Sequence, residues 1–181
     1  MGVYISILRG INVSGQKLIK MVDLVKHFQS LGMKQVRTYI QSGNIIFQCS
    51  DSAPGKIALK IEKKIKKEYG FDVPVIVKSA KDIEKTLNNN PFLKRGESSN
   101  QLYVTFLSDV PKRELVNSIN AKQYLPEEFI WDKDRIYFFS PHGYGNAKMN
   151  NNFFENKLKL KATTRNWKTV IKLFELAAQA D

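Results

Sequence analysis

Segments with the residue pattern of a strand and segments with that of a helix follow one another in the first 80 residues. The order of these segments restricts the folds that the chain can form. The segment "VYISIL" at 3–8 is rich in β-branched and aromatic residues, which is typical of a strand. The next segment, "MVDLVKHFQSL", repeats apolar residues along one side and predicts a helix that ends at Gly32. Two extended runs follow in "QVRTYIQSGNIIF", and the turn residues Ser42-Gly43-Asn44 between them predict a hairpin.

A second helix and a further strand complete this pattern. Isoleucines recur every four residues between Pro54 and Tyr69, and "VPVIVK" at 73–78 predicts a strand. The order strand, helix, strand, strand, helix, strand is the ferredoxin-like pattern, an antiparallel sheet with both helices on one face. We therefore expect an α+β fold whose first half, residues 1–80, is ferredoxin-like (βαββαβ).

The pattern then begins again. "LYVTFLS" at 102–108 repeats the residue classes of "VYISILR" at 3–9 position by position. We expect a helix at 81–90, a short helix from Pro111 to about Lys122, strands "FIW" and "RIYFF", a helix at 151–158 and a last helix from about Thr163. Residues 81–181 are therefore predicted to form a related second α+β half with an extra C-terminal helix. The polar loop at 94–100 is the expected boundary.

The composition limits the classes of partner. Lys and Arg total 29 against 17 Asp and Glu, and residues 1–90 carry 15 of the basic and 7 of the acidic groups. This excess favours anionic partners, although general solubility explains it equally well. No apolar run is as long as the roughly 18 residues that span a membrane, so we expect no membrane partner. The single cysteine, Cys49, permits no internal disulfide and indicates a cytoplasmic location.

The loop "RGINVSGQK" after the first strand comes close to a nucleotide-binding motif. Gly10 and Gly15 have the spacing of a P-loop, but Gln16 stands in the place of its lysine and Leu18 in the place of its hydroxyl. The parallel βαβ setting of that motif is also missing, so the loop does not predict nucleotide hydrolysis. Two glycines before a helix still allow backbone N–H groups to hold an anion. The alternative is a shaped loop without a ligand.

The expected ferredoxin-like topology places other loops beside this one. In a ferredoxin-like unit the loop after the first strand, the central hairpin and the turn near Gly70 lie at the same end of the sheet. We therefore predict one polar, ligand-binding rim formed by Arg9, Asn12, Ser14, Lys17, Gln41, Ser42 and Asn44.

Two further cations are ligand-binding candidates in the second half. We expect Thr163 or Thr164 to cap the last helix, with Arg165 and Lys168 in its first turn. Cations there oppose the helix dipole, so their placement is unfavourable unless a ligand compensates for it. The loop "SPHGYGNAK" at 140–148 has two interpretations, an anion contact through Lys148 or a turn that its glycines permit.

Catalytic and metal chemistry finds little support in the sequence. His27, His142 and Cys49 have no spacing typical of zinc, and no metal site is predicted. Cys49 closes a predicted strand, and we interpret it as a small buried hydrophobe. No catalytic residue or cofactor is assigned.

Several segments together resemble a known family. "LRGINVSG", "VRTYIQSGNIIF", "VPVIVKSA", "NPF" and "TTRNWKTVIKL" look like the domain-of-unknown-function 1697 family, a group of uncharacterised bacterial proteins. This chain has Ser14-Gly15 where the family commonly has Gly-Gly, and Ala147-Lys148-Met149 where it has Ser-Lys-Leu. The resemblance implies a duplicated α+β fold of ferredoxin-like character, with no established activity and no catalytic residues to carry over.

Three functional hypotheses follow. The first is a binder of an anionic ligand, either nucleic acid or a phosphorylated molecule. Strand aromatics of the kind on which RNA-recognition modules stack bases are present, although packing of the halves is the preferred interpretation for most of them: Tyr4, Tyr39, Phe47, Tyr103, Tyr137 and Phe139. The second is an enzyme acting on a phosphorylated or nucleotide-like small molecule at the 10–17/41–44 rim. The third is a protein-interaction module that docks through helix faces or sheet edges; the sequence does not predict an oligomeric state.

Overall fold

Two separate four-stranded sheets organise the chain in a computed structural model that describes residues 1–180. The chain divides into a first unit, Met1–Lys85 with the residues from Lys172 onward, and a second unit, Thr86–Ile171. Each unit contains one of the sheets.

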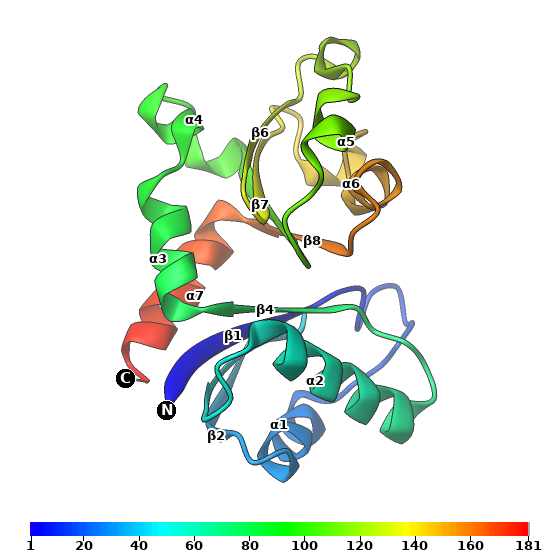
Figure 1. Cartoon of the computed structure of the whole chain (residues 1–181), viewed down its shortest axis with the longest axis vertical. Helices are drawn as coiled ribbons and strands as arrows, with labels where there is room; N and C mark the ends of the chain where they lie inside the picture. Colours follow the sequence, from blue (N-terminus) through cyan, green and yellow to red (C-terminus); the bar gives the residue numbers. More distant parts are fainter. Residues whose placement is uncertain (181) are drawn as a thin grey trace. The chain divides into compact units, whose positions relative to one another are not determined.

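The first unit has the predicted ferredoxin-like topology. Its elements are β1 (Gly2–Leu8), α1 (Met21–Ser30), β2 (Lys34–Tyr39), β3 (Asn44–Cys49), α2 (Pro54–Tyr69), β4 (Val75–Ser79) and the start of α3 (Ala80–Asn88). The sheet order is β2-β3-β1-β4, and every neighbouring pair is antiparallel. Figure 1 shows α1 and α2 covering the same face of this sheet.

The core of the first unit follows from two periodicities. On α2, the side chains of Ile57, Ile61 and Ile65 are buried, because a spacing of four keeps them on one side of the helix. Alternate strand residues such as Tyr4 and Leu8 join them in one hydrophobic cluster. Cys49 also belongs to this cluster, as its interpretation as a buried hydrophobe requires.

The second unit repeats the sheet order of the first. It contains the rest of α3, then α4 (Pro91–Lys94), β5 (Leu102–Leu107), α5 (Arg113–Asn117), β6 (Glu128–Asp132), β7 (Arg135–Phe139), α6 (Asn151–Leu158), β8 (Ala162–Asn166) and the start of α7 (Trp167–Ala178), with short 3₁₀ turns at Ser99–Gln101, Ala121–Tyr124 and Tyr144–Asn146. Its order is β6-β7-β5-β8, again antiparallel throughout. The two halves are thus related, as the recurrence of residue classes predicts.

Two predicted elements of the second unit are wrong in detail. The last helix begins at Trp167 rather than near Thr163, and the residues before it form β8, which pairs with β5. The reason is that the β-branched Thr163 and Thr164 favour a strand, and the cap is Asn166, whose Oδ1 accepts the Thr169 N–H at 2.8 Å. The helix expected from Pro111 to about Lys122 is interrupted, and only α5 and a 3₁₀ turn form there.

Equivalent central hydroxyls have different environments in the two units. Ser6 on β1 and Thr105 on β5 are both fully buried. Thr105 Oγ1 lies 2.7 Å from Thr164 Oγ1, a hydrogen-bonding distance. Ser6 is paired with Val77 of β4, and its Oγ has no hydrogen-bond partner among residues 1–180. The first unit therefore bears the desolvation penalty of an unpaired hydroxyl.

We expect Ser6→Ala to leave stability unchanged or to raise the free energy of unfolding by about 1 kcal/mol, because it removes an unpaired buried hydroxyl. Thr105→Val keeps the side-chain shape but deletes a hydrogen bond, so it is expected to lower that free energy by about 1 kcal/mol. Urea unfolding followed by circular dichroism measures both. A loss of stability in the Ser6 variant as large as in the Thr105 variant contradicts the prediction.

Candidate functional site

The predicted rim is assembled at one end of the first sheet. The backbone N–H of Leu8 donates to the Gly43 carbonyl at 2.8 Å, which joins the end of β1 to the central hairpin. The next N–H, from Arg9, donates to the Pro74 carbonyl at 3.0 Å, which joins it to the segment after α2. The loop after β1 therefore lies beside both neighbours that the topology predicts, and Figure 1 shows it at this end of the sheet.

The side chain of Asn12 forms hydrogen bonds within the loop and to the hairpin; we call these bonds the Asn12 clip. Its Oδ1 accepts the Ile19 N–H at 2.9 Å, and its Nδ2 donates to the carbonyls of Ile19 at 2.9 Å and Gln41 at 3.0 Å. Since its amide is occupied by backbone groups, Asn12 shapes the rim and does not offer a free group to a ligand.

The loop holds an unusual backbone conformation. Positive φ angles occur at five positions: Gly10 (71°), Asn12 (55°), Ser14 (50°), Gly15 (73°) and Lys17 (46°). Each non-glycine residue there is disfavoured by about 1 kcal/mol or more, and such strain gathers at functional sites. A short turn, closed by the Gln16 N–H on the Val13 carbonyl at 2.9 Å, forms the tip. The loop is therefore a preformed structure.

Lys17 extends the rim toward the end of α2. Its Nζ donates to the Asp72 carbonyl at 2.6 Å, while the Asp72 carboxylate accepts a bond from Lys66 at 2.8 Å. This bond from Lys66 holds the pKa of Asp72 below its ordinary value. The negative charge of Asp72 is thus compensated from α2, and Lys17 adds a second cation beside it.

The hairpin contributes a tight and partly strained turn. Asn44 is fully buried, and its Nδ2 donates to Ser42 Oγ at 2.9 Å and to the Tyr39 carbonyl at 3.3 Å. The side chain of Ile40 is half exposed. Its φ is 50°, and a positive φ is rare for a β-branched residue. Gly43 has a φ of 78° and fits closely against β1.

The structure thus separates the seven predicted rim residues into two roles. Asn12, Ser42 and Asn44 hold the loop and hairpin in place through the bonds described above. Ser14 and Gln41 are exposed, and Arg9 and Lys17 are partly exposed. Asn12 and Ser42 are partly exposed as well, whereas Asn44 is buried.

The remaining two candidates lie in the second unit. Arg165 belongs to β8, not to a helix, and its Nη1 donates to Thr163 Oγ1 at 3.1 Å and to the Thr164 carbonyl at 2.9 Å. Burial lowers the pKa of Arg165 to about 10. Lys168 is exposed in the first turn of α7, as expected. The dipole argument therefore holds for Lys168 alone.

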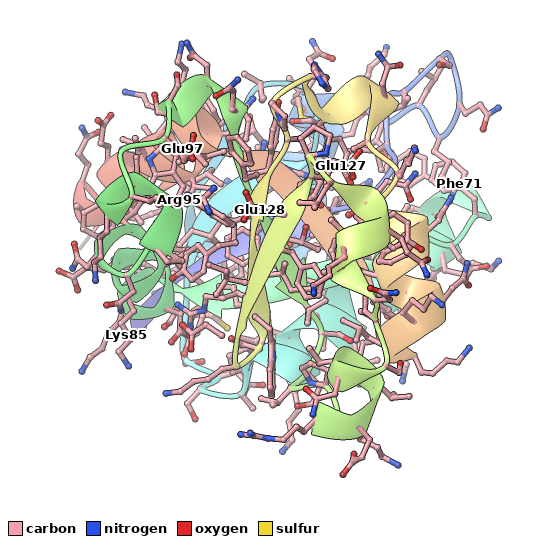
Figure 2. The ribbon with its side chains drawn as sticks, turned by 90° about the horizontal axis from the view of Figure 1, so that it is seen from above. Phe71, Lys85, Arg95, Glu97, Glu127 and Glu128 are labelled. Atoms are coloured by element: carbon pink, nitrogen blue, oxygen red, sulfur yellow. The ribbon has the colours of Figure 1, made fainter. Side chains whose placement is uncertain are left out.

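Glu127 is a buried residue that the sequence does not single out. Its Oε1 accepts the Lys148 N–H at 2.8 Å and its Oε2 accepts the Met149 N–H at 2.9 Å, so one carboxylate fixes the end of the glycine-bearing loop. Gly143 in this loop has a φ of 82°, which supports the interpretation of a glycine-permitted turn. The adjacent Glu128 instead binds Arg95 through two bonds, at 2.8 and 2.9 Å; Figure 2 shows Arg95, Glu97 and Glu128 side by side.

A second polar feature of the first unit lies between α1 and α2. An open depression of about 230 Å³ is lined by Asp23, Lys26, His27, Glu68 and Tyr69. His27 Nε2 and Tyr69 Oη are 3.1 Å apart, and burial is the main cause that raises the pKa of Tyr69. Among residues 1–180, no group of three or more His, Cys, Asp or Glu side chains is arranged to hold a metal ion.

Most of the strand aromatics belong to the cores. Tyr4, Phe47, Tyr137 and Phe139 are buried, and this excludes them as exposed stacking platforms. Tyr103 is partly exposed but packs on Tyr144 with ring centroids 5.4 Å apart. No helix in the described part of the chain is long and apolar enough to cross a bilayer.

Comparisons with known proteins agree with this architecture. The family model described as "Protein of unknown function (DUF1697)" matches residues 1–137. A conserved bacterial protein, SP0830 from Streptococcus pneumoniae, has a similar solved structure, with a TM-score of 0.68 and 24% sequence identity over 97% of this chain and 98% of that one. At this identity the likeness shows the fold alone. None of the curated proteins matches the chain.

Proposed function

This chain belongs to the DUF1697 family of proteins of unknown function, so its activity has to be argued from its own residues, and we propose that it binds a phosphate-bearing ligand at the rim of the first unit. The ligand class includes phosphorylated small molecules and nucleic acid, which share the same anionic group.

The observation that carries this proposal is the preformed loop between β1 and α1. Three non-glycine residues of the loop have positive φ angles, and the Asn12 clip holds the loop against the hairpin. A binding site that is already ordered loses less entropy when its ligand arrives, so strain stored in a fixed polar loop favours binding.

The chemistry of the solvent-facing groups suits an anion. Arg9, Lys17 and the exposed Lys20 bring three cations to the loop, and Ser14 and Gln41 add side-chain hydrogen-bond donors. Lys66 compensates the carboxylate of Asp72, the residue that Lys17 contacts. The surplus of positive charge in residues 1–90 attracts anions toward this unit as well.

The expected result of removing two rim cations is a large loss of affinity. The double variant Lys17→Gln, Lys20→Gln should bind AMP, pyrophosphate or inorganic phosphate about 10-fold more weakly than the natural chain, because each solvent-exposed ion pair with the anion contributes about 0.2–1 kcal/mol. Isothermal titration calorimetry at low salt measures the dissociation constants.

The matched control is Lys34→Gln, Lys81→Gln, which removes the same charge from exposed positions outside the rim. The control should keep the affinity within about twofold, since a remote charge acts only through the screened general field. If no phosphate-bearing probe binds, or if both double variants weaken binding equally, the rim is not the binding site.

A further inference from the structure

A straight row of lysines runs along α2. Residues on an α-helix advance by about 100° each, so the positions 56, 60, 63 and 67 fall within a narrow stripe on one side of the helix. The stripe is formed by Lys56, Lys60, Lys63 and Lys67. It faces away from the buried side, which Ile57, Ile61 and Ile65 occupy, and all four lysines are exposed.

The stripe is only partly neutralised within the chain. Lys60 pairs with Asp51 at 3.1 Å, whereas Lys63 and Lys67 form no ion pair with any described residue. Like charges three or four residues apart destabilise a helix by about 0.2–0.5 kcal/mol per pair. A row of anionic groups outside the helix relieves this repulsion.

The stripe leads to the rim. The C-terminal end of α2 is followed by Gly70 and then by Asp72, which Lys66 and Lys17 contact from the helix and from the loop. Figure 1 shows α2 running toward the end of the sheet where the loop after β1 lies. Lys66 of α2 and Lys17 of the rim thus meet at Asp72, and we call the lysine stripe together with Lys66 and Lys17 the basic track of the first unit.

We propose that this track binds the phosphodiester backbone of a single nucleic-acid strand. From Lys56 to Lys67 the stripe is about 16 Å long, which several successive phosphates fill and one phosphate does not. A single row of cations matches one backbone, whereas a duplex presents two. This inference rests on the proposed function, because it identifies the phosphate-bearing ligand of the rim as a polymer.

The test is a salt titration of fluorescently labelled 20-nucleotide oligo(U) and oligo(dT), followed by anisotropy on the full chain. Four phosphate contacts predict that log K falls with log salt concentration at a slope of about −3. The variant Lys63→Gln, Lys67→Gln should flatten this slope by about 1.4 and weaken binding about 10-fold or more at 0.1 M salt. The two oligomers distinguish RNA from DNA.

The control Lys122→Gln, Lys157→Gln removes the same charge from exposed sites of the second unit and should leave the slope unchanged. Equal slopes in both double variants, an oligomer that binds no tighter than AMP, or a duplex that binds as tightly as the single strand overturns the inference. AMP binding that depends on the rim then still supports the proposed function. Conversely, rim-independent binding of AMP with a stripe-dependent slope overturns the proposed function, and with it the contribution of the rim to the track.

Discussion

Gly43→Ala should lower the free energy of unfolding by at least about 3 kcal/mol. Two effects add at this position. A Cβ on Gly43 would lie 2.6 Å from Leu8 Cβ and 2.9 Å from Ile11 Cδ1, which are distances that force β1 and the hairpin apart. Its φ of 78° is also disfavoured for any residue with a Cβ. Urea unfolding followed by circular dichroism measures the change.

The matched control is Gly15→Ala, which separates the two effects. Gly15 has a similar φ of 73°, but a Cβ there would meet nothing within 4 Å. Its substitution should therefore cost about 1 kcal/mol from conformation alone. Equal losses in the two variants would show that the close fit of the hairpin against β1 contributes nothing to stability.

Glu127→Gln is expected to lower the free energy of unfolding by about 2–3 kcal/mol. The carboxylate uses one oxygen for each of two backbone N–H groups, those of Lys148 and Met149. An amide of the same size offers only one acceptor, so one buried N–H is left facing an NH₂ group. Hydrogen exchange should show faster exchange at the Lys148 or Met149 amide, together with an earlier urea midpoint.

Glu114→Gln serves as the control for this experiment, because Glu114 is an exposed residue of α5. Its effect should stay within about 0.5 kcal/mol, as for most surface substitutions. A Glu127 variant that is as stable as this control, with unchanged exchange at both amides, would mean that the loop does not depend on the carboxylate.

The first unit could be predicted from the sequence because each of its elements has a clear local residue pattern. The spacing of Ile57, Ile61 and Ile65 marks one helix, and the turn residues at Ser42-Gly43-Asn44 mark the hairpin. Topology then places the hairpin beside the loop after β1, and the bond from Leu8 to Gly43 confirms this placement. Here local pattern and tertiary structure agree.

The second unit could be predicted only in part. β8 is short and polar, and Thr163 and Thr164 serve equally well as strand residues or as helix caps. Their pairing with β5 decides between the two, and a partner 59 residues away, as Thr164 is from Thr105, leaves no local trace. The role of Glu127 could not be predicted for the same reason, because the two N–H groups that its carboxylate binds belong to residues distant in the sequence.

Within the candidate site, residue types were predictable but their roles were not. Asn12 and Asn44 look like ligand contacts in the sequence, but the Asn12 amide bonds backbone groups, and the Asn44 NH₂ group donates to Ser42 Oγ and to the Tyr39 carbonyl. An amide side chain satisfies a turn and a ligand with the same atoms, so composition cannot distinguish the two uses. Lys17 also tethers the loop, through a bond to the Asp72 carbonyl, but its ammonium group carries a charge and three donors.

The return of the C-terminal residues to the first unit affects how the chain is made. Gln48 on β3 donates through Nε2 to the carbonyl of Ala180 at 2.6 Å, a contact between residues that are synthesised 132 positions apart. During translation, the strands β1 to β4 are synthesised long before Ala180. The amino-terminal unit therefore waits for the whole second unit to emerge before its own last contacts form, and no single cut releases both units intact.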